Sequence, residues 1–467
     1  MKRSTFPRIS KSDIVILNIC IIFALLLWLR LWHTWTNHEL LQKQHPRLRK
    51  TVFEGTGTGG RWHIPSKWLK DGADLPKGLK SSPKTVLEAA HLAFYLARSQ
   101  SRYIANSSIP LILHQSWYSM TAASWSPLIQ DYVESWLTVC AGDRPPEVGL
   151  GHDDIHQDEM AYIIWDNSGM DLFVKEYEGA FWESYAALPI PVEQVDVFRV
   201  AVLRWFGGVY SDIDTKPLRH PVSWIEPADI DPWIDHSKGR TYSLSSAANG
   251  GPLYPPPSHS PAFYSMLYEM STNLSSKEPG ISAIVGLEAD LPPEGDKYWR
   301  AGYEYPVQIT QWTLALAPHH PISSRFVSAV DKDIKMLQST DNLNDAFAVD
   351  LTGPVQFTRV IKEWLESVSG LRWNALTGLH DGGRSKTVKD VLVLPITGFS
   401  PGRGIMNNMG SKPVTDRSAR VLHGFQGSWR GSFDLVPEFG KMCRTFFGKC
   451  RTMSKTPRRN VRRVKHP

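Results

Sequence analysis

Short apolar runs alternate with longer amphipathic stretches through the middle of the chain. Residues 109–114 and 162–165 are apolar runs too short for ordinary helices, so the pattern predicts buried strands there. Apolar side chains recur every three or four positions around 125–136, 173–185 and 196–206, which predicts three helices. Alternating strands and helices indicate an α/β sheet, whose ligands bind beyond the carboxyl ends of the strands.

The second half of the chain extends this pattern. Residues 281–290 and 391–395 are expected to be strands, and residues 308–317 are expected to be a helix. A further helix is expected to open at 352–354, where glycine and proline precede a periodic apolar run. These elements add to the same α/β sheet.

A strongly apolar segment lies near the N-terminus. Residues 14–29 are almost continuously apolar, and the run to Trp32 covers nineteen residues, close to the ~20 needed to span a bilayer. Basic residues precede this segment, so the positive-inside rule predicts a type II membrane protein with a luminal body. A cleaved signal peptide is the alternative, but no small-residue cleavage pattern follows the run.

The expected domain organisation follows from these segments. Between the anchor and the first predicted strand, glycine-rich and basic stretches surround one expected helix at 83–100, which is typical of a stem. The units are a cytosolic tail at 1–13, a transmembrane anchor at 14–32, a stem at 33–108, a catalytic domain at 109–450 and a basic disordered tail at 451–467.

Charge and cysteine content narrow the function classes. The formal net charge is +6, but the last seventeen residues carry seven basic side chains and no acid, and the first thirty carry a net +4. The remaining body therefore carries about −5, and we do not expect it to bind nucleic acid. Cys443 and Cys450 could close a small loop and leave Cys140 free, although spacing alone does not fix the pairing.

Two aspartates follow a double glycine at 207–208. Because side chains alternate along a strand, Asp212 and Asp214 should leave the same face of an extended chain. Paired carboxylates at a strand end suit a divalent cation, which prefers oxygen ligands and phosphate. The pattern therefore favours binding a nucleotide diphosphate and stabilising the charge that it gains as a leaving group.

Other interpretations of these aspartates remain open. A bare Asp-x-Asp is also common as a pair of surface acids. Phosphatases of the haloacid-dehalogenase type carry Asp-x-Asp-x-Thr after a strand, but that strand should be a longer aliphatic run without the glycine pair. Acids at a buried strand end without a cation would be costly, which favours the metal-binding interpretation.

Further polar and aromatic residues accompany the aspartates. Asp196 and Arg199 share one helix face, either as an ordinary surface ion pair or as groups aimed at a sugar or phosphate. Trp117 follows the first strand, either as a core aromatic or as a platform for a base. His423 is either a structural histidine or a third ligand beside the two carboxylates.

Six blocks between about 109 and 430 resemble glycosyltransferase family 32 in a fixed order. They are Ile109-Pro…His114-Gln-Ser-Trp117, Asp196-x-x-Arg199…Gly207-Gly208-Val-Tyr210-Ser-Asp212-Ile-Asp214-Thr215, Gly286-Leu-Glu288-Ala-Asp290, Thr310-Gln-Trp312…His320-Pro321, Thr352-Gly353-Pro354…Phe357-Thr358, and His423…Gly427-Ser428-Trp429. The resemblance implies a GT-A fold, a single Rossmann-like nucleotide-sugar-binding domain.

The resemblance also implies roles for these residues. Asp212 and Asp214 would hold Mn²⁺ on the donor diphosphate, with His423 as a further ligand. The expected donor-binding residues are Asp196, Arg199, Tyr210, Trp117, Ser428 and Trp429. Glu288 and Asp290 are candidates for orienting the acceptor.

The implied activity is retaining transfer of mannose from GDP-mannose to an N-glycan mannose in α-1,6 linkage, at the Golgi membrane. No protein nucleophile is then required, because front-face displacement needs only charge stabilisation and positioning. Inositolphosphoceramide mannosyltransferases are a related alternative, but they usually carry extra C-terminal hydrophobic segments. A non-catalytic subunit of a mannan-building complex is another alternative, although it would not need all four of Asp196, Arg199, Asp212 and Asp214.

Overall fold

The computed structural model describes most of the expected catalytic body. Among the described residues, no helix has both the length and the apolar character needed to cross a membrane. The expected anchor at 14–32, apart from Trp28, and both terminal tails lie outside the described residues. The described residues are 28, 55–71, 75–76, 78–142, 159–245, 280–403, 409–426 and 435–450.

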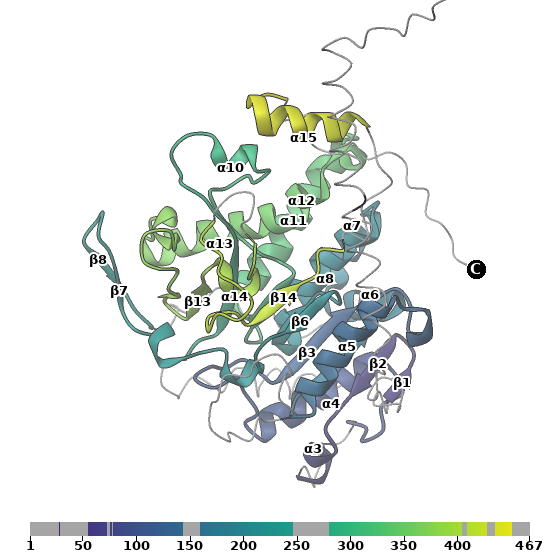
Figure 1. Cartoon of the computed structure of the whole chain (residues 1–467). Coiled ribbons are helices and arrows are strands. Elements are labelled where there is room, and N and C mark those ends of the chain that lie inside the picture. Colours follow the sequence, from purple (N-terminus) through teal and green to yellow (C-terminus); the bar gives the residue numbers. More distant parts are fainter. Residues whose placement is uncertain are drawn as a thin grey trace, which may run out of the picture.

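A mixed sheet of ten described strands forms the centre of the fold (Figure 1). The spatial order is β1 (Gly55–Gly57), β2 (Gly60–His63), β4 (Ala161–Trp165), β3 (Ile112–Ser116), β5 (Gly208–Ser211), β11 (Thr313–Leu316), β9 (Ala283–Asp290), β13 (Val391–Leu394) and β12 (Lys386–Val388), with β10 (Val307–Ile309) beside β9. Strand β3 is parallel to β4 and β5, and β9 is parallel to β13, while β11 runs antiparallel between β5 and β9. The carboxyl ends of these five parallel strands and the start of β11 therefore meet at one edge.

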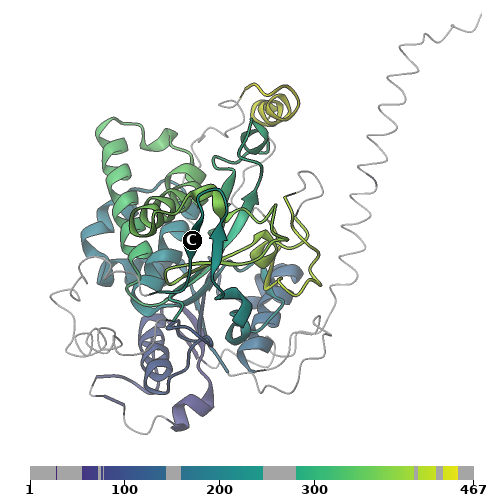
Figure 2. The ribbon, with the colours of Figure 1, turned by 90° about the vertical axis from the view of Figure 1, so that its left-hand side faces the viewer.

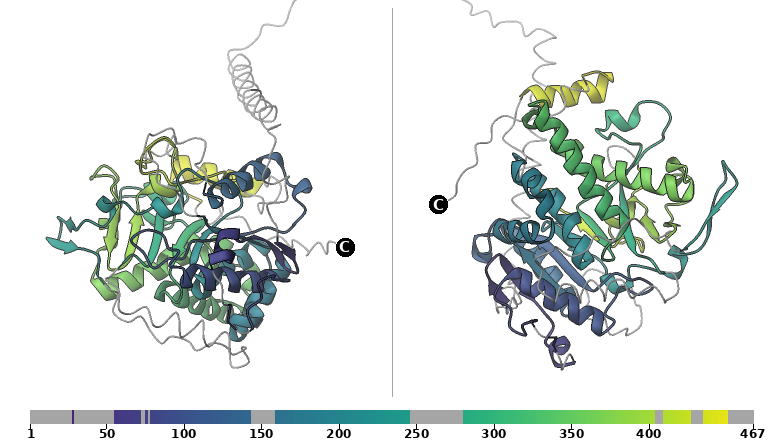
Figure 3. Two further views of the ribbon diagram at one scale, coloured as in Figure 1. Left: turned by 90° about the horizontal axis from the view of Figure 1, so that it is seen from below. Right: turned by 180° about the vertical axis from the view of Figure 1, so that it is seen from behind.

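Helices cover both faces of the sheet (Figures 2 and 3). One face carries α4 (Val86–Ser99), α6 (Asn167–Tyr177), α8 (Pro191–Phe206), α11 (Pro321–Ser339) and α13 (Pro354–Ser369). The other face carries α5 (Pro127–Cys140), α14 (Ile396–Phe399) and a small sheet of β6 (Thr215–Pro217) and β14 (Val421–His423). The remaining described α-helices and β-strands are α3 (Ser66–Asp71), α7 (Trp182–Ala187), α10 (Lys297–Arg300), α12 (Ala348–Leu351), α15 (Leu435–Phe447) and the hairpin β7 (Trp233–Asp235)–β8 (Arg240–Tyr242).

The double glycine joins α8 to β5 at the centre of the sheet. Gly207 and Gly208 have φ angles of 62° and 97°, a region that glycine adopts without strain. A Cβ atom at Gly208 would lie 2.4 Å from the carbonyl oxygen of Ile112 in β3. Only glycine therefore lets the chain leave α8 and pair at once with β3.

The expected stem boundary at 109 needs correction. Strand β2 pairs with β4 from Gly60↔Trp165 to His63↔Tyr162, so it belongs to the central sheet. The expected helix at 83–100 is confirmed as α4, but its buried face packs in the main core. Residues 55–108 are therefore part of the folded body, and β1 and β2 were missed because their glycines carry no apolar pattern.

The expected helix at 308–317 is wrong. These residues form β10 and β11, separated by a short connection. Both strands are buried on both faces, so the period of two that marks a half-exposed strand is missing. The expected helix at 173–185 is two helices, α6 and α7, separated by a 3₁₀ turn at Gly179–Phe181.

The cysteines follow the arrangement that was left open. Cys443 and Cys450 form a disulfide, and Cys140 is buried in the core.

Candidate active site

The two aspartates lie on a tight turn at the end of β5. The expected extended strand ends at Ser211, and Asp212 to Asp214 lead directly into β6. The backbone N–H of Thr215 donates to the Asp212 carbonyl over 3.1 Å, and the Thr215 hydroxyl donates to the same oxygen. The aspartates are therefore brought together by a closed turn rather than by strand alternation.

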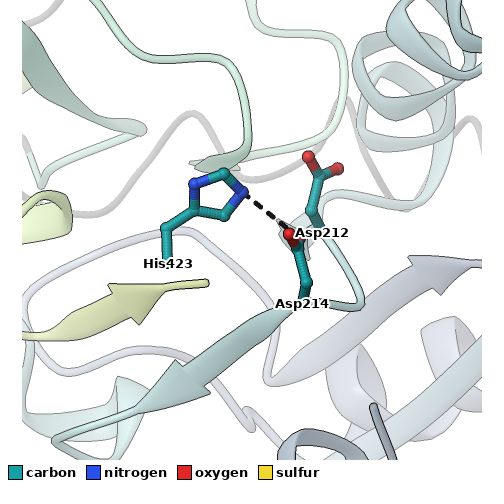
Figure 4. Close-up of side chains that lie close together, drawn as sticks. All are labelled: Asp212, Asp214 and His423. Carbon is teal, nitrogen blue, oxygen red and sulfur yellow. Dashed lines mark ion pairs between the residues drawn. The ribbon is translucent and has the colours of Figure 1, made fainter. Parts of the chain in front are cut away.

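His423 joins these aspartates from a distant part of the chain. Strand β14 pairs with β6 so that His423 lies opposite Thr215. Asp212, Asp214 and His423 each offer one ligand atom, and these atoms all lie within 4.8 Å of one another. Figure 4 shows the imidazole extending toward Asp214, with His423 Nε2 3.2 Å from Asp214 Oδ1. The predicted trio therefore converges.

The segment after His423 wraps around Asp214. The N–H of Gly424 donates to the Asp214 carbonyl over 2.7 Å, and the N–H of Gln426 donates to Asp214 Oδ2 over 2.9 Å. Burial opposes ionisation of Asp214, but hydrogen bonds from His423 and Gln426 outweigh it and lower the pKa of this carboxyl. Phe425, between the two donors, has a φ of 48° and stays 46% exposed.

A buried ion-pair network connects α8 to the same turn. Arg199 Nη2 lies 3.1 Å from both Asp196 Oδ1 and Asp212 Oδ1. The Thr352 hydroxyl donates to Asp196 Oδ2 over 3.0 Å. Asp196 and Arg199 are only 6% and 5% exposed, which excludes the interpretation of an ordinary surface pair.

The electrostatics of this network follow from its burial. Burial raises the pKa of Asp196 to about 6 even though Arg199 opposes the rise. Burial also raises the pKa of Asp212, again against the attraction of Arg199. Tyr210, whose hydroxyl lies 2.9 Å from Ser116 Oγ, contacts the guanidinium of Arg199 with its ring.

These groups suit a divalent cation. Two carboxylates and an imidazole provide the oxygen and nitrogen ligands that Mn²⁺ or Mg²⁺ accept. Asp196 and Asp212 share the guanidinium of Arg199, and Asp214 pairs with His423, so a dication would balance the excess negative charge of the three carboxylates. The donor set and the charge balance therefore both fit the metal that a DXD site implies.

The acceptor candidates lie at the end of β9 and differ in their contacts. Asp290 accepts hydrogen bonds from the Thr377 hydroxyl and the Gly378 N–H over 2.6 and 2.7 Å, so it fixes that turn. Glu288 accepts a hydrogen bond from Gln308. Burial raises the pKa of Glu288, although the positive charge of Arg403 opposes the rise.

The remaining predicted donor residues have different outcomes. Trp117 is half-buried at the end of β3, and its ring centroid lies 4.7 Å from that of exposed Tyr118. Ser428 and Trp429 lie outside the described residues. Gln115 lies in the same motif, two residues before Trp117. Its side-chain Nε2 donates to the Asp212 carbonyl over 3.0 Å and supports the turn.

Sequence reasoning missed several aromatic and basic neighbours of the trio. The Trp312 ring lies parallel to the His423 imidazole, with centroids 4.7 Å apart and an interplanar angle of 5°. The Arg403 guanidinium carbon lies 4.5 Å from the Phe425 ring centroid and 5.4 Å from that of Trp312. Trp312 belongs to a block that signalled family resemblance, but the incorrect helix assignment hid its position before a central strand.

Known proteins match the part of the chain that carries this geometry. Residues 152–239 match the family described as "Glycosyltransferase sugar-binding region containing DXD motif", and this range includes Asp196, Arg199, Asp212 and Asp214. The "Initiation-specific alpha-1,6-mannosyltransferase" of Schizosaccharomyces pombe is 34% identical over 251 residues, which cover 53% of this chain and 49% of that protein.

Two further relatives are more distant. The Candida albicans protein of the same name is 26% identical over 311 residues, or 61% of this chain and 66% of that protein. The "Inositol phosphoceramide mannosyltransferase 3" of Schizosaccharomyces pombe is 26% identical over 126 residues, or 26% of this chain and 30% of that protein. The chain thus spans about half to two thirds of the length of the α-1,6-mannosyltransferases that it matches. Over residues 152–239 it is therefore similar to the DXD-containing sugar-binding region of glycosyltransferases, and it carries this region on a mixed α/β fold with a central sheet.

Proposed function

We propose that this protein is a retaining α-1,6-mannosyltransferase that uses GDP-mannose and Mn²⁺ and acts on a mannose of N-linked glycans. The observation that carries the proposal is the convergence of Asp212, Asp214 and His423 beside the buried Arg199. The names and the coverage of the α-1,6-mannosyltransferase relatives support the choice of sugar and linkage.

Asp212, Asp214 and His423 would hold the divalent cation, which supplies positive charge against the donor diphosphate when it is bound. Asp196 has a carboxylate oxygen suited to accept a hydrogen bond from a hydroxyl of the donor sugar. Arg199 pairs with both Asp196 and Asp212 and so fixes the positions of their carboxylates. Its planar guanidinium can bind hydroxyl or phosphate oxygens with several donors at once.

The reaction balances without a protein nucleophile. The bond between the sugar anomeric carbon and the diphosphate oxygen breaks, and the acceptor oxygen bonds to the same face of that carbon. The acceptor proton passes to the departing phosphate oxygen. The protein then contributes positioning and charge stabilisation, which are the terms that this buried network can supply.

Other parts of the proposal follow from the sequence. We propose a GT-A fold, a Golgi location through an anchor at 14–32, and a luminal body. Trp117 would lie by the base, Ser428 and Trp429 would close over the phosphates, and Glu288 would face the acceptor.

A lipid acceptor is the second candidate, because an inositol phosphoceramide mannosyltransferase is among the relatives. Its match covers 26% of this chain, against 53% for the Schizosaccharomyces pombe α-1,6-mannosyltransferase. We therefore favour a glycan acceptor.

The test is a panel of sugar nucleotides offered to the purified full chain with Mn²⁺. We expect hydrolysis of GDP-mannose, transfer to a mannose oligosaccharide rather than to inositol phosphoceramide, and loss of both with a chelator. Asp212→Asn and Asp214→Asn should abolish turnover, whereas Asp333→Asn should not, because Asp333 pairs with Arg359 on the outer helices. Turnover of no sugar nucleotide, or equal turnover by Asp212→Asn in chelator, would refute the proposal.

A further inference from the structure

We propose that Trp312 is a positioning residue for the metal site, holding Asp212 through its main chain and His423 through its ring. Trp312 thereby sets the affinity of the site for a divalent cation. This inference rests on the proposed function only in assuming that Asp212, Asp214 and His423 bind such a cation.

The main-chain contact follows from the strand register. Strand β11 pairs antiparallel with β5, and Thr313 lies opposite Ser211. Trp312, one residue earlier, therefore lies opposite Asp212, whose N–H donates to the Trp312 carbonyl over 2.7 Å. The backbone of the first metal-site aspartate is fixed by this hydrogen bond.

The ring contact fixes the other end of the site. The Trp312 ring lies parallel to the His423 imidazole at 4.7 Å, and its Nε1–H donates to the Phe399 carbonyl in α14 over 3.2 Å. Phe425 packs edge-on against both rings, at 4.1 Å from His423 and 5.3 Å from Trp312. The imidazole is thus held by two aromatic rings, one of which is anchored to a helix.

The orientation of the His423 ring depends on this packing. Histidines that bind metals almost always donate their second ring nitrogen to a carboxylate, a carbonyl or water, which fixes the ring. In the described part of the chain, His423 Nδ1 is buried and has no hydrogen-bond partner. Strand β14, which carries His423, is only three residues long. Stacking on Trp312 therefore takes the orienting role that a hydrogen bond usually fills.

A direct contact between Trp312 and substrate fits these observations less well. Trp312 is 8% exposed, one ring face lies against His423, and its single N–H donor is used by Phe399. Little of the ring is left to stack on a sugar or a base. Its effect should therefore appear in metal binding itself, without any donor present.

The experiment measures Mn²⁺ binding to the purified full chain without nucleotide, by the electron paramagnetic resonance signal of free Mn²⁺. Trp312→Leu should weaken binding about 10- to 100-fold, the range for groups that orient a metal ligand. Trp312→Phe, which keeps a flat ring, should bind within about threefold of the wild type. Trp312→Met also lacks the ring, but its flexible side chain adapts to an irregular gap, so it replaces the leucine variant if that variant does not fold.

Trp233→Leu is the matched control. Trp233 is also buried, stacks on Tyr242 at 4.7 Å, and donates its Nε1–H to the Thr387 carbonyl over 2.8 Å. It lies in β7, outside the trio, so its loss should leave Mn²⁺ affinity unchanged. Equal weakening by Trp233→Leu would mean that any lost indole disturbs the site, and this would overturn the proposal.

A double variant separates positioning from general damage. In a His423→Ala background, Trp312→Leu should have little further effect, because the ring has no imidazole left to orient. Full additivity of the two losses, or wild-type affinity in Trp312→Leu, would overturn the role of Trp312. Unchanged Mn²⁺ affinity in the Asp212→Asn, Asp214→Asn double variant would instead refute the metal site of the proposed function.

Discussion

Replacing Arg199 tests the buried network most directly. Its guanidinium is the single basic group within 4.0 Å of both Asp196 and Asp212 among the described residues, at 3.1 Å from each. Arg199→Met keeps most of the aliphatic bulk but leaves the buried Asp196 carboxylate and the partly exposed Asp212 carboxylate without the cation between them. Asp196 would then retain one side-chain donor, the Thr352 hydroxyl. Both folding and catalysis should therefore suffer.

The magnitude follows from the burial of the partners. Removing one member of a buried ion pair typically costs about 3–5 kcal/mol, because the remaining charge is left uncompensated. Asp196 is 6% exposed, so it has little access to water that would compensate. We expect Arg199→Met to lower the free energy of unfolding by roughly 3–4 kcal/mol. Arg199→Lys should cost less, about 1–2 kcal/mol, because charge remains but one ammonium lacks the planar fork that reaches both acids.

The assay combines chemical unfolding with donor hydrolysis per folded molecule. Arg204→Met is the matched control on the same helix, since Arg204 pairs with buried Glu178 over 2.8 Å. It should lose similar stability yet keep its specific activity, whereas Arg199→Lys should lose activity beyond its loss of stability. Wild-type stability of Arg199→Met, or full specific activity of Arg199→Lys, would refute this account of the network.

Two further predictions concern the fold. Burial lowers the pKa of His114 to about 3. Below about pH 6.5 the unfolded chain therefore binds a proton that the folded chain does not bind. The contribution of neutral His114 to folding stability is complete above that pH and is lost as the pH falls toward 3. As the pH is lowered from 6 to 4, the free energy of unfolding of the wild type should therefore decrease. In His114→Gln this decrease should be smaller by about 1.4 kcal/mol per pH unit. Identical slopes for the two proteins would contradict this prediction. Gly208→Ala should destabilise the protein by at least ~2 kcal/mol, because its Cβ would meet the Ile112 carbonyl oxygen at 2.4 Å, while Gly239→Ala, with φ of 61° and open space, should cost about 1–2 kcal/mol. Equal losses in thermal unfolding would show that the close approach to β3 is relieved at little cost.

The sequence predicted the parallel strands best. Strands β3, β4, β9 and β13 are buried on both faces, so they stand out as apolar runs between polar turns. Strands β1 and β2 were invisible because glycines occupy positions where a core strand would show branched apolar side chains. Strands β10 and β11 were misassigned because the buried polar residues Gln308, Thr310 and Gln311 interrupt the apolar run, and uniform burial leaves no alternation to indicate a strand.

The site was predictable as far as local motifs reach. The aspartate pair, the Asp196–Arg199 face and the candidate ligand His423 could be named from residue type and spacing. The contact between Arg199 and Asp212 depends on how α8 packs over the turn, and the position of Trp312 depends on the register of β11 against β5. Such contacts between distant segments are set by tertiary packing, and the periodicity of apolar residues along one sequence does not reveal them.

The segment that wraps Asp214 has a consequence for biogenesis. Asp214 and its hydrogen-bond donor Gln426 are separated by 212 positions in the sequence. The hydrogen bond between them therefore forms only after nearly the whole body has been synthesised and has folded. Contacts of such long range form late, because closing a large loop is entropically costly. An unfinished or misfolded chain would hold the carboxylates but not the imidazole. Competence to bind a divalent cation would thus report that the body has folded completely.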